Sequence, residues 1–514
     1  MVKRAEGALL QSIRIDRAAP QTLSLQITAG LRDLILSGAL KPGERLPATR
    51  TLASEFGVAR TTIVETFERL VAEGIVVTRV GAGTYVSEAL NADRPALAVT
   101  PSVPSVSIAR LARGMAAASG RFGARLEHEP RPFTTAMPAF DAFPMAQWAR
   151  LSSKNWRMAR HAVLGYPDPQ GYEPLRQAIA NHLRVNRGIQ CEWRQIFIVA
   201  GAQQAFQLIA ATLVDAGDKV WFENPGAIGA RNSFVLYGAD IVPVPVDDGG
   251  LDVRRGLDLA PDFKLVFATP SHQQPLGSKM SLERRFMLLD AAEQASGWII
   301  EDDWDGEFCF AGPPLPTLKG IDASGRVIYV GTFSKSLFPA LRLGFLLAPP
   351  ALTEYFRMSL EAYSPGVPTA LQATVADFIN EGHFATHIRR MRKLYAERCQ
   401  ALFDAAQQRL AAWMDLVPTN TGMHTIAYLK PGFDADLVSA AAAKRGVTVT
   451  PISRFYLGPA PHQALVLGFS GFTPAKIQQA AHALEEVFLD LAPRKRKMAR
   501  SSKIGLVFPS EWTS

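Results

Sequence analysis

The spacing of apolar and polar positions divides the chain into two regions. In residues 13–87, apolar residues recur at helical intervals in three stretches, and a ribbon-like segment, IVVTRVGAGTYVS, follows them. In residues 131–492, near-continuous apolar runs (QIFIVA, KVWFENP, KLVFATP, WIIEDD, VIYVGTFS and GFLLAP) alternate with helical segments such as SLERRFMLLDAAEQA. Uninterrupted apolar strands separated by helices are typical of a parallel sheet covered on both faces. The pattern predicts a small helical domain followed by a large α/β domain with a mostly parallel sheet.

The segments between and after these regions have a different character. Residues 88–130 are rich in Ala, Pro and Ser and show little periodicity, which predicts a linker. Residues 493–514 open with PRKRKMAR and are basic. We expect a solvated tail there, in preference to an additional DNA contact.

Composition and charge narrow the class of protein. The 514 residues are 48% hydrophobic and 20% charged, as in ordinary globular proteins, and the net charge of +8 permits an acidic partner without identifying one. Three widely spaced cysteines form neither a disulfide framework nor a zinc motif. The N-terminus lacks the apolar core of a signal peptide, and no apolar run reaches the length of a membrane span. We therefore expect a cytoplasmic protein with no membrane partner and no metal site.

The first region has the layout of a helix-turn-helix with a wing. Gly57 supplies the turn between two helical stretches, and the second stretch opens with an arginine and two short hydroxyl side chains: Arg60, Thr61 and Thr62. Side chains on the first turn of such a helix can reach phosphates and base edges. Arg79 lies where a β-wing would meet the DNA backbone. A plain helical bundle with surface arginines is the alternative, but the turn, the wing and the arginines agree on a DNA-binding domain.

The same residues carry a family resemblance. The segment LPATRTLASEFGVARTTIVETFERLVAEG, which leads to RVGAGTYV, resembles the winged helix of the GntR family. The resemblance implies that operator DNA is contacted by the arginine of the L-P-x-x-R element and by the R-T-T opening, here Arg50, Arg60, Thr61 and Thr62. The family often has serine or threonine where this chain has Ala59. The domain is only weakly positive, so we expect affinity to depend on pairing two such domains in a dimer.

The most informative segment of the large domain is VIYVGTFSKSLFPALRLGFLLAP. An apolar strand ends at Gly331, the hydroxyl residues Thr332 and Ser334 follow, then Lys335, and Arg342 lies seven residues further on. This is the arrangement needed to hold a phosphorylated aldehyde as a Schiff base on a lysine. A lone lysine after serine would ordinarily be a surface lysine, and three other segments decide against that alternative.

The three segments each follow an apolar strand. WIIEDDWDGEF places Asp302 where a carboxylate can keep a pyridine nitrogen protonated. IVAGAQQAFQLIA is a strand, a turn and a helix whose first amides, at Ala202 and Gln203, suit a phosphate. TPSHQQPLG offers polar side chains, among them Gln274, to a phenolic oxygen. A metal pair at Asp303 and Asp305 is the rival interpretation, and it is disfavoured because no histidine lies nearby in the sequence.

Taken together, the segments resemble fold-type I aminotransferases that use pyridoxal 5′-phosphate (PLP). Their order, AGAQQ, ENPG, TPSHQQPLG, IIEDDWD and GTFSK, matches the MocR subfamily, which joins a GntR-type domain to such a fold. The resemblance implies that Lys335 is the Schiff-base lysine and that Asp302 is the pyridinium partner. It implies a phosphate cup made of Thr332, Ser334, Arg342 and the Ala202–Gln203 turn.

Two further roles follow from the resemblance alone. Tyr166 matches a tyrosine that reaches the phosphate from the partner subunit of a homodimer, with a core tyrosine before a turn as the alternative. Arg454 matches an arginine that would bind the carboxylate of an effector.

The chain departs from the family pattern at four positions. Ala227 replaces a tyrosine stacked on the ring, Trp304 replaces a cofactor-contacting tyrosine, and Ala202 replaces a serine or threonine at the phosphate turn. Val466 stands where aminotransferases carry an arginine. Lys335 and Asp302 are intact, so we expect PLP to bind but do not expect efficient transamination.

We therefore interpret the chain as a PLP-dependent transcription regulator. A small amino compound would displace Lys335 from the aldimine and thereby change how a dimer presents its two DNA-binding domains. Two alternatives stay open: a genuine aminotransferase, and a cofactor-free DNA-binding protein that uses the large domain as a dimerisation scaffold.

Overall fold

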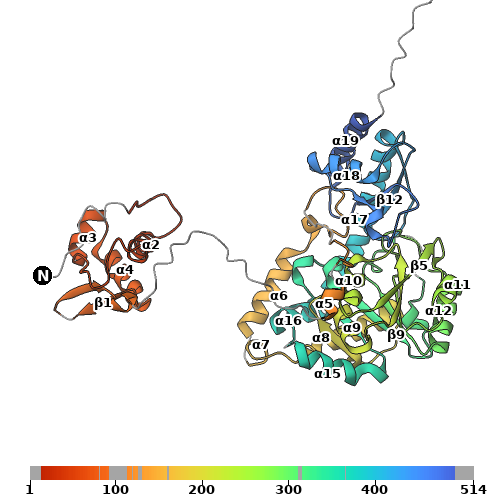
Figure 1. Ribbon diagram of the computed structural model, residues 1–514, viewed down its shortest axis with the longest axis horizontal. Coiled ribbons are helices and arrows are strands. Elements are labelled where there is room, and N and C mark those ends of the chain that lie inside the picture. Colours follow the sequence, from red (N-terminus) through yellow and green to blue (C-terminus); the bar gives the residue numbers. More distant parts are fainter. Residues whose placement is uncertain are drawn as a thin grey trace, which may run out of the picture. The chain divides into compact units, whose positions relative to one another are not determined.

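The computed structural model describes most of the chain as two separate units. The described residues are 13–79, 81–91, 113–118, 120–124, 130–158, 161–310, 315–364 and 366–492. The chain divides into residues 1–108 and 109–514 (Figure 1), and this division falls inside the predicted linker. The predicted tail at 493–514 and most of the predicted linker lie outside the described residues.

The first unit is a winged helix-turn-helix. Its helices are α2 (Leu23–Leu36), α3 (Thr49–Phe56) and α4 (Arg60–Ala72), and its wing pairs β1 (Val76–Arg79) with β2 (Gly83–Val86). A short 3-10 helix, η1 (Glu88–Asn91), follows the wing. The core between the helices contains Ile27, Leu31, Leu52, Ile63 and Leu70. Gly57 ends α3 in the left-handed conformation, with φ of 62°, which lets the chain turn sharply into α4.

An eight-stranded sheet forms the centre of the second unit. The strands lie in the order β3 (Ile196–Val199), β10 (Gly344–Leu347), β9 (Val327–Thr332), β8 (Trp298–Asp302), β7 (Leu265–Ala268), β4 (Lys219–Asn224), β5 (Asp240–Asp247) and β6 (Gly250–Leu251). Strands β9, β8, β7, β4 and β5 run parallel, whereas β10 is antiparallel to both neighbours and β6 to β5. The predicted mostly parallel sheet is confirmed.

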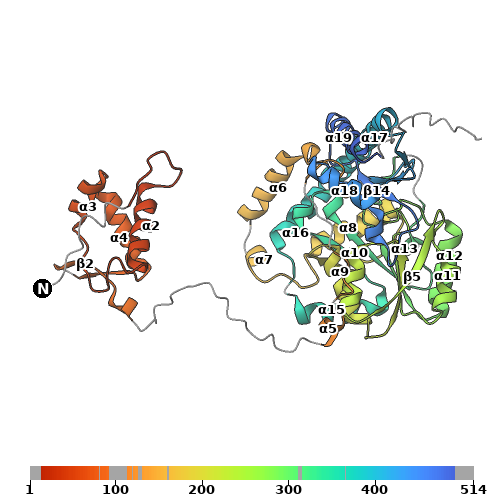
Figure 2. The ribbon, with the colours of Figure 1, turned by 45° about the horizontal axis from the view of Figure 1, so that its top comes forward.

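Alternating side chains of the strands bury both faces of this sheet. Val220 and Phe222 pack on one face and Trp221 on the other, as the two-residue period of a strand requires. The first face is covered by α9 (Ala202–Leu213), α10 (Ile228–Leu236) and α15 (Thr353–Tyr363). The second face is covered by α8 (Glu173–Arg187), α11 (Val253–Leu259), α12 (Leu282–Gln294) and α16 (Thr369–Asn380). The helices surround the strands in both views (Figures 1 and 2).

A smaller subdomain follows the long helix α17 (His383–Arg409). It contains a four-stranded antiparallel sheet in the order β11 (Met414–Leu416), β12 (His424–Leu429), β14 (Ala464–Gly468) and β13 (Thr450–Pro451). Helices α18 (Ala435–Lys444) and α19 (Pro474–Leu491) pack with α17 around these strands, at the top of Figure 1. No helix in the described part of the chain is long and apolar enough to cross a membrane.

Residues that the sequence assigns to the linker also contact the second unit. Helix α5 (Arg113–Ala118) lies against α10, and the backbone of Gly123 exchanges two hydrogen bonds, of 2.9 and 2.8 Å, with the side chain of Asn232. Arg121 donates to the carbonyl of Ala239 at 2.9 Å. These polar contacts need no apolar periodicity, which is why the segment reads as linker in the sequence.

Replacement of Phe267 by alanine should destabilise the second unit. The ring is fully buried in β7, stacks on Phe222 at 4.6 Å and meets Phe206 edge-on at 5.4 Å. The expected loss is about 3–5 kcal/mol in the free energy of unfolding. Denaturant unfolding followed by tryptophan fluorescence reports on this unit, because Trp148 is the first tryptophan of the chain. Leu259→Ala, at an exposed position of α11, is the control, and equal losses in the two variants would contradict this prediction.

Candidate functional site

The carboxyl ends of three adjacent parallel strands carry the predicted chemistry. Strand β7 ends before the loop with Gln274, β8 ends at Asp302, and β9 ends just before Lys335. Ligands of open α/β sheets bind at this edge, because the loops that follow the strands meet there. The fold thus brings together residues that are up to sixty-one positions apart in the sequence, from Gln274 to Lys335.

Lys335 lies on a single helical turn immediately after β9. This turn, α14 (Phe333–Ser336), is capped by Thr332, whose hydroxyl accepts a hydrogen bond from the backbone N–H of Ser334 at 3.1 Å. Lys335 is half-buried, and its positive charge acts to lower the pKa of Asp302 and of Asp305. The predicted lysine and the predicted carboxylate therefore share one site. The hydroxyl of Thr332 has a structural role in the cap, and Ser334 is buried beside it.

Asp302 and Asp303 each have a buried carboxylate oxygen, Oδ1, without a hydrogen-bond partner among the described residues, and Asp302 is the one at the end of β8. Asp302 is 5% exposed. Burial raises the carboxyl pKa well above its usual value, and the neighbouring Asp303, Glu223 and Asp305 raise it further. A buried acceptor without a donor is costly, so it marks a place where a bound group supplies the donor. A protonated ring nitrogen fits this requirement in charge and in hydrogen bonding.

The start of α9 and Arg342 form a second part of the site. Gly201, with φ of 87°, precedes α9, so Ala202 and Gln203 occupy the first helical turn. Arg342 adopts the left-handed conformation, with φ of 50°, and donates to the carbonyl of Ala200 at 3.1 Å. A Cβ on Gly201 would lie 3.6 Å from the guanidinium carbon of Arg342. A helix N-terminus beside an arginine is suited to a phosphate group.

The side chain of Gln203 turns away from this helix start. Its amide donates to the carbonyl of Gly229 at 3.0 Å and contacts the hydroxyl of Ser233. The side chain of Gln203 is thus bound to α10, and its backbone amide, the group predicted for phosphate, lies in the first turn of α9.

The loops after β7 and β8 hold Gln274 and Trp304 differently. Gln274 is half-buried, precedes the cis peptide bond to Pro275, and its N–H donates to the hydroxyl of Thr269 at 3.2 Å. The indole N–H of Trp304 donates to the carbonyl of His272 at 3.0 Å, and its ring stacks on His424 at 5.7 Å. A buried indole needs such a partner. The polar atom of Trp304 is thus committed to the protein backbone.

Tyr166 and Arg454 come from segments other than the loops that follow β7, β8 and β9. Tyr166 is 98% exposed, so it is not a core tyrosine and does not enter the site of its own subunit. Arg454, in the 3-10 helix η6 (Ile452–Phe455), donates to the carbonyl of Ala124 at 3.0 Å. Val466 is 1% exposed in β14 and packs with Ile228 and Ile426, so the position is apolar.

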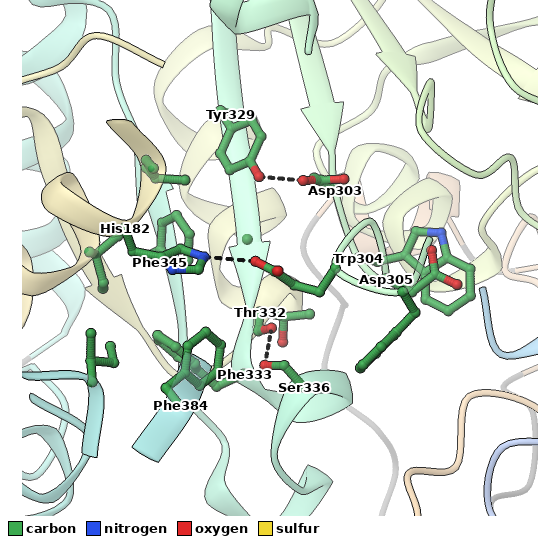
Figure 3. A pocket seen from close by; sticks show the side chains of 16 residues that line it. His182, Asp303, Trp304, Asp305, Tyr329, Thr332, Phe333, Ser336, Phe345 and Phe384 are labelled. Atoms are coloured by element: carbon green, nitrogen blue, oxygen red, sulfur yellow. Dashed lines mark hydrogen bonds and ion pairs between the residues drawn. The ribbon is translucent and has the colours of Figure 1, made fainter. Parts of the chain in front are cut away.

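Several buried polar residues of the site were missed by the sequence analysis. Asp303 pairs with Arg187 of α8 and accepts a hydrogen bond from the hydroxyl of Tyr329 (Figure 3). The imidazole of His272 contacts Asp305 at 2.8 Å. The only signals available were the histidine in TPSHQ and the extra acids in EDDWD, whose partners lie far away in the sequence. Asp303 and Asp305 thus each have a protein partner, and the described ranges contain no cluster of three or more side chains that could hold a metal ion.

Figure 3 shows a cavity beside these pairs. Its lining includes Asp303, Asp305, Tyr329 and Thr332 but neither Asp302 nor Lys335. His182 and Glu307, 2.7 Å apart, lie on another part of the lining. Most of the lining is apolar, so the cavity lies between the polar pairs of the loop after β8 and the apolar core beside α8.

The winged-helix unit presents its predicted arginines at the starts of two helices. Arg50 and Arg60 are exposed on the first turns of α3 and α4, and the Nε of Arg60 lies 3.4 Å from the hydroxyl of Thr49. Thr61 is exposed and Thr62 half-buried on the same turn of α4. At the end of β1, exposed Arg79 pairs with Glu88 at 3.1 Å and lies 4.9 Å from the ring centre of Tyr85. The ion pair offsets part of the positive charge of the wing.

Comparisons with known proteins match both units. Residues 23–86 match the family of bacterial regulatory proteins, gntR family, and residues 138–484 match aminotransferase class I and II. The chain is 39% identical to the probable rhizopine catabolism regulatory protein MocR of Rhizobium meliloti, over 93% of this chain and 96% of that protein. It is 30% identical to the pyridoxine biosynthesis transcriptional regulator PdxR of Corynebacterium glutamicum, over 89% of this chain and 94% of that protein.

A solved structure agrees with the second match. Kynurenine aminotransferase of Pyrococcus horikoshii superposes with a TM-score of 0.65 at 26% identity, over 70% of this chain and 91% of that enzyme. The aminotransferase fold thus accounts for the second unit and a GntR-type winged helix for the first. With both units matched in one chain, the protein belongs to the MocR subfamily of GntR-type transcription regulators, whose helix-turn-helix domain implies binding to operator DNA.

Proposed function

We propose that this protein is an effector-responsive transcription regulator that carries PLP on Lys335 and senses a small amino compound there. The observation that carries the proposal is the unpartnered, buried Oδ1 of Asp302 on the strand next to the one that leads to Lys335. A buried carboxylate oxygen that lacks a donor, beside a lysine at the end of a strand, matches the needs of a protonated pyridine ring held covalently through an aldehyde.

Each predicted residue then has a defined task. Asp302 would accept a hydrogen bond from the ring nitrogen, and Gln274 would face the phenolic oxygen, with Trp304 bounding the site. The phosphate would be held by Arg342, Ser334, Thr332 and the amides of Ala202 and Gln203. When bound, PLP supplies an electrophilic carbon that a primary amine can reach in place of Lys335.

A homodimer would complete the site. Tyr166 is almost fully exposed in its own subunit, which leaves its hydroxyl available to the phosphate site of a second copy. Two winged-helix units in one dimer would also raise the affinity for a two-part operator, because each contributes its own phosphate contacts.

The contact between Arg454 and Ala124 suggests how effector binding could change the segment that connects the two units. Ala124 lies at the end of a segment that Asn232 and Arg121 fasten to the second unit, and the chain before this segment leads to the winged helix. An effector carboxylate that recruits Arg454 would compete with the carbonyl of Ala124. We propose that this exchange loosens residues 120–124 together with the preceding helix α5, and so changes the length of chain available between the two units.

The first test concerns the attachment of the cofactor. After incubation with PLP and reduction with borohydride, the peptide that contains Lys335 should carry a pyridoxyl group, and Lys335→Ala should abolish the label. Lys393→Ala, at an exposed position of α17, is the matched control and should keep the label. Mass spectrometry of digested protein measures both outcomes. A wild-type protein without label at residue 335 would contradict the proposal and favour the alternative of a cofactor-free DNA-binding protein whose large domain is a dimerisation scaffold.

The second test concerns DNA. Replacement of Arg60 by alanine should weaken binding to an operator fragment selected with the wild-type protein by about 1–3 kcal/mol, because an arginine at the start of the recognition helix is lost. Arg69→Ala is the control: it removes the same charge from the last turn of α4, where Arg69 pairs with Glu65 at 2.7 Å. Fluorescence anisotropy at one fixed salt concentration measures both. Equal losses would show that only net charge matters.

The third test separates sensing from output. In Asn232→Ala, a primary amine chosen for its effect on the wild-type absorption spectrum should still bind within about twofold, whereas its effect on operator affinity should fall by about 1 kcal/mol or more, since the fastened segment is already loose. Asn186→Ala, at an exposed position of α8, is the matched control and should behave as wild type. An unchanged DNA response in Asn232→Ala would contradict the proposed route.

A further inference from the structure

Asp302 lies in an unusually acidic neighbourhood. Glu223, Asp303 and Asp305 are all close enough to raise its pKa, and each of these side chains is almost completely buried. Asp302 has to be ionised to keep a ring nitrogen protonated. Each buried negative charge nearby opposes that ionisation, because charges interact strongly where water is excluded. The fold must therefore neutralise the neighbours of Asp302.

Two of these three carboxylates have a cationic or ionisable partner, and the third is held by neutral donors. Asp303 pairs with Arg187, and His272 contacts Asp305 at 2.8 Å. Glu223 accepts hydrogen bonds from the N–H and the hydroxyl of Thr269 at 2.9 and 2.6 Å and from Gln273 at 3.0 Å. Burial raises the pKa of Glu223 to about 7. Asp303, by contrast, is held by a guanidinium, so the Arg187–Asp303 pair sets how strongly this neighbouring carboxylate acts on Asp302.

Arg187 is placed to do more than neutralise one charge. It is the last residue of α8, its side chain is 5% exposed, and that of Asp303 is 4% exposed. Its guanidinium also donates to the carbonyl of Gly306 at 3.0 Å and to the hydroxyl of Ser271 at 3.3 Å. Burial opposes the positive charge, yet Asp303 raises the guanidinium pKa above its usual value. One arginine thus fastens the loops after β7 and β8 and remains charged.

The hydroxyl of Tyr329 completes the arrangement around Asp303. It lies on β9 and donates to the same carboxylate (Figure 3). Asp303 directly follows Asp302, the last residue of β8, and its carboxylate is bound by one side chain from α8 and one from β9.

We propose that Arg187 is a positioning residue for Asp302: by confining the charge of Asp303 to a separate ion pair, it keeps the Asp302 carboxylate ionised and directed at the ring nitrogen of PLP. This inference rests on the proposed function, because it assigns Arg187 a role only when PLP binds. Arg187 touches neither the cofactor nor an effector in this scheme. Its effect passes through Asp303 to Asp302.

Charge removal in steps tests the proposal. Arg187→Gln leaves Asp303 with the hydroxyl of Tyr329 but without a cation, and it should weaken PLP binding to the apoprotein by up to about tenfold at neutral pH, since a rise of one pKa unit on Asp302 lowers its ionised fraction by up to about tenfold. The double variant Arg187→Gln/Asp303→Asn removes both charges and should recover most of the affinity. If Arg187 only held the two loops together, the double variant should bind PLP as weakly as Arg187→Gln, because it also lacks the contacts to Ser271 and Gly306.

The pH dependence gives a second, independent readout. A raised pKa means that Asp302 is ionised only at higher pH, so the PLP affinity of Arg187→Gln should be lost at a higher pH than that of wild type as the solution is acidified. Asp303→Asn removes the carboxylate that raises the pKa of Asp302 and leaves Arg187 in place, so the loss should move to a lower pH. Titration of apoprotein with PLP, followed by absorbance between about pH 6 and about pH 9, measures both shifts.

Folding and cofactor binding can be separated in the same experiment. Thermal unfolding of each apoprotein shows whether Arg187→Gln folds, and if it does not, Asp303→Asn alone decides through the direction of its pH shift. Failure of the wild-type protein to bind PLP would overturn the proposed function. If wild type binds PLP but the double variant stays as weak as Arg187→Gln, or Asp303→Asn shifts the loss to higher pH, only the role of Arg187 is refuted.

Discussion

The burial of one carboxyl group, that of Asp302, sets the conditions for the whole site. Asp302 gains burial from its place at the end of β8, and the same burial raises its pKa. The charge is tolerable only if a cation approaches its free oxygen and if the neighbouring acids are neutralised. Lys335, Arg187, His272 and the donors around Glu223 all serve that requirement. The polar interior at this sheet edge is therefore one set of coupled charges in which acidic groups predominate.

The parallel sheet is what makes such a set possible. Adjacent strands β7, β8 and β9 end at one edge, so three loops of unrelated sequence can each contribute one or two polar groups. The apolar strands and the helices on both faces fix these loop starts rigidly. Burial on both faces also excludes water, which strengthens every interaction at the edge. A rigid frame with short functional loops suits a protein in which a small ligand has to shift a conformational equilibrium. Movement that begins in the loops is then not absorbed by deformation of the sheet and its helices.

The sequence predicted the features that depend on residues close together in the chain. Strands β7, β8 and β9 were recognisable as apolar runs, and Lys335 and Asp302 were recognisable because each directly follows or ends such a run. Strand β5 was missed because its prolines, Pro243 and Pro245, argue against a strand, and they are accommodated next to the two-residue β6 near the sheet edge. Arg187 could not have been predicted, since it ends a helix 116 residues before Asp303 and only the fold brings the two together.

The departures from the aminotransferase pattern form a consistent picture once their surroundings are known. Val466 belongs to an apolar cluster that also contains Ile228 and Ile426, so an arginine there would be buried without a partner. The indole of Trp304 is bonded to a backbone carbonyl and stacked on His424, so its loop is held by the protein itself. Both changes remove polar groups that could act on a substrate and leave Asp302 and Lys335 untouched. Under the proposed function, Lys335 and Asp302 would hold the cofactor, while the site would offer an amino compound fewer polar groups that assist proton transfer, which favours binding over turnover.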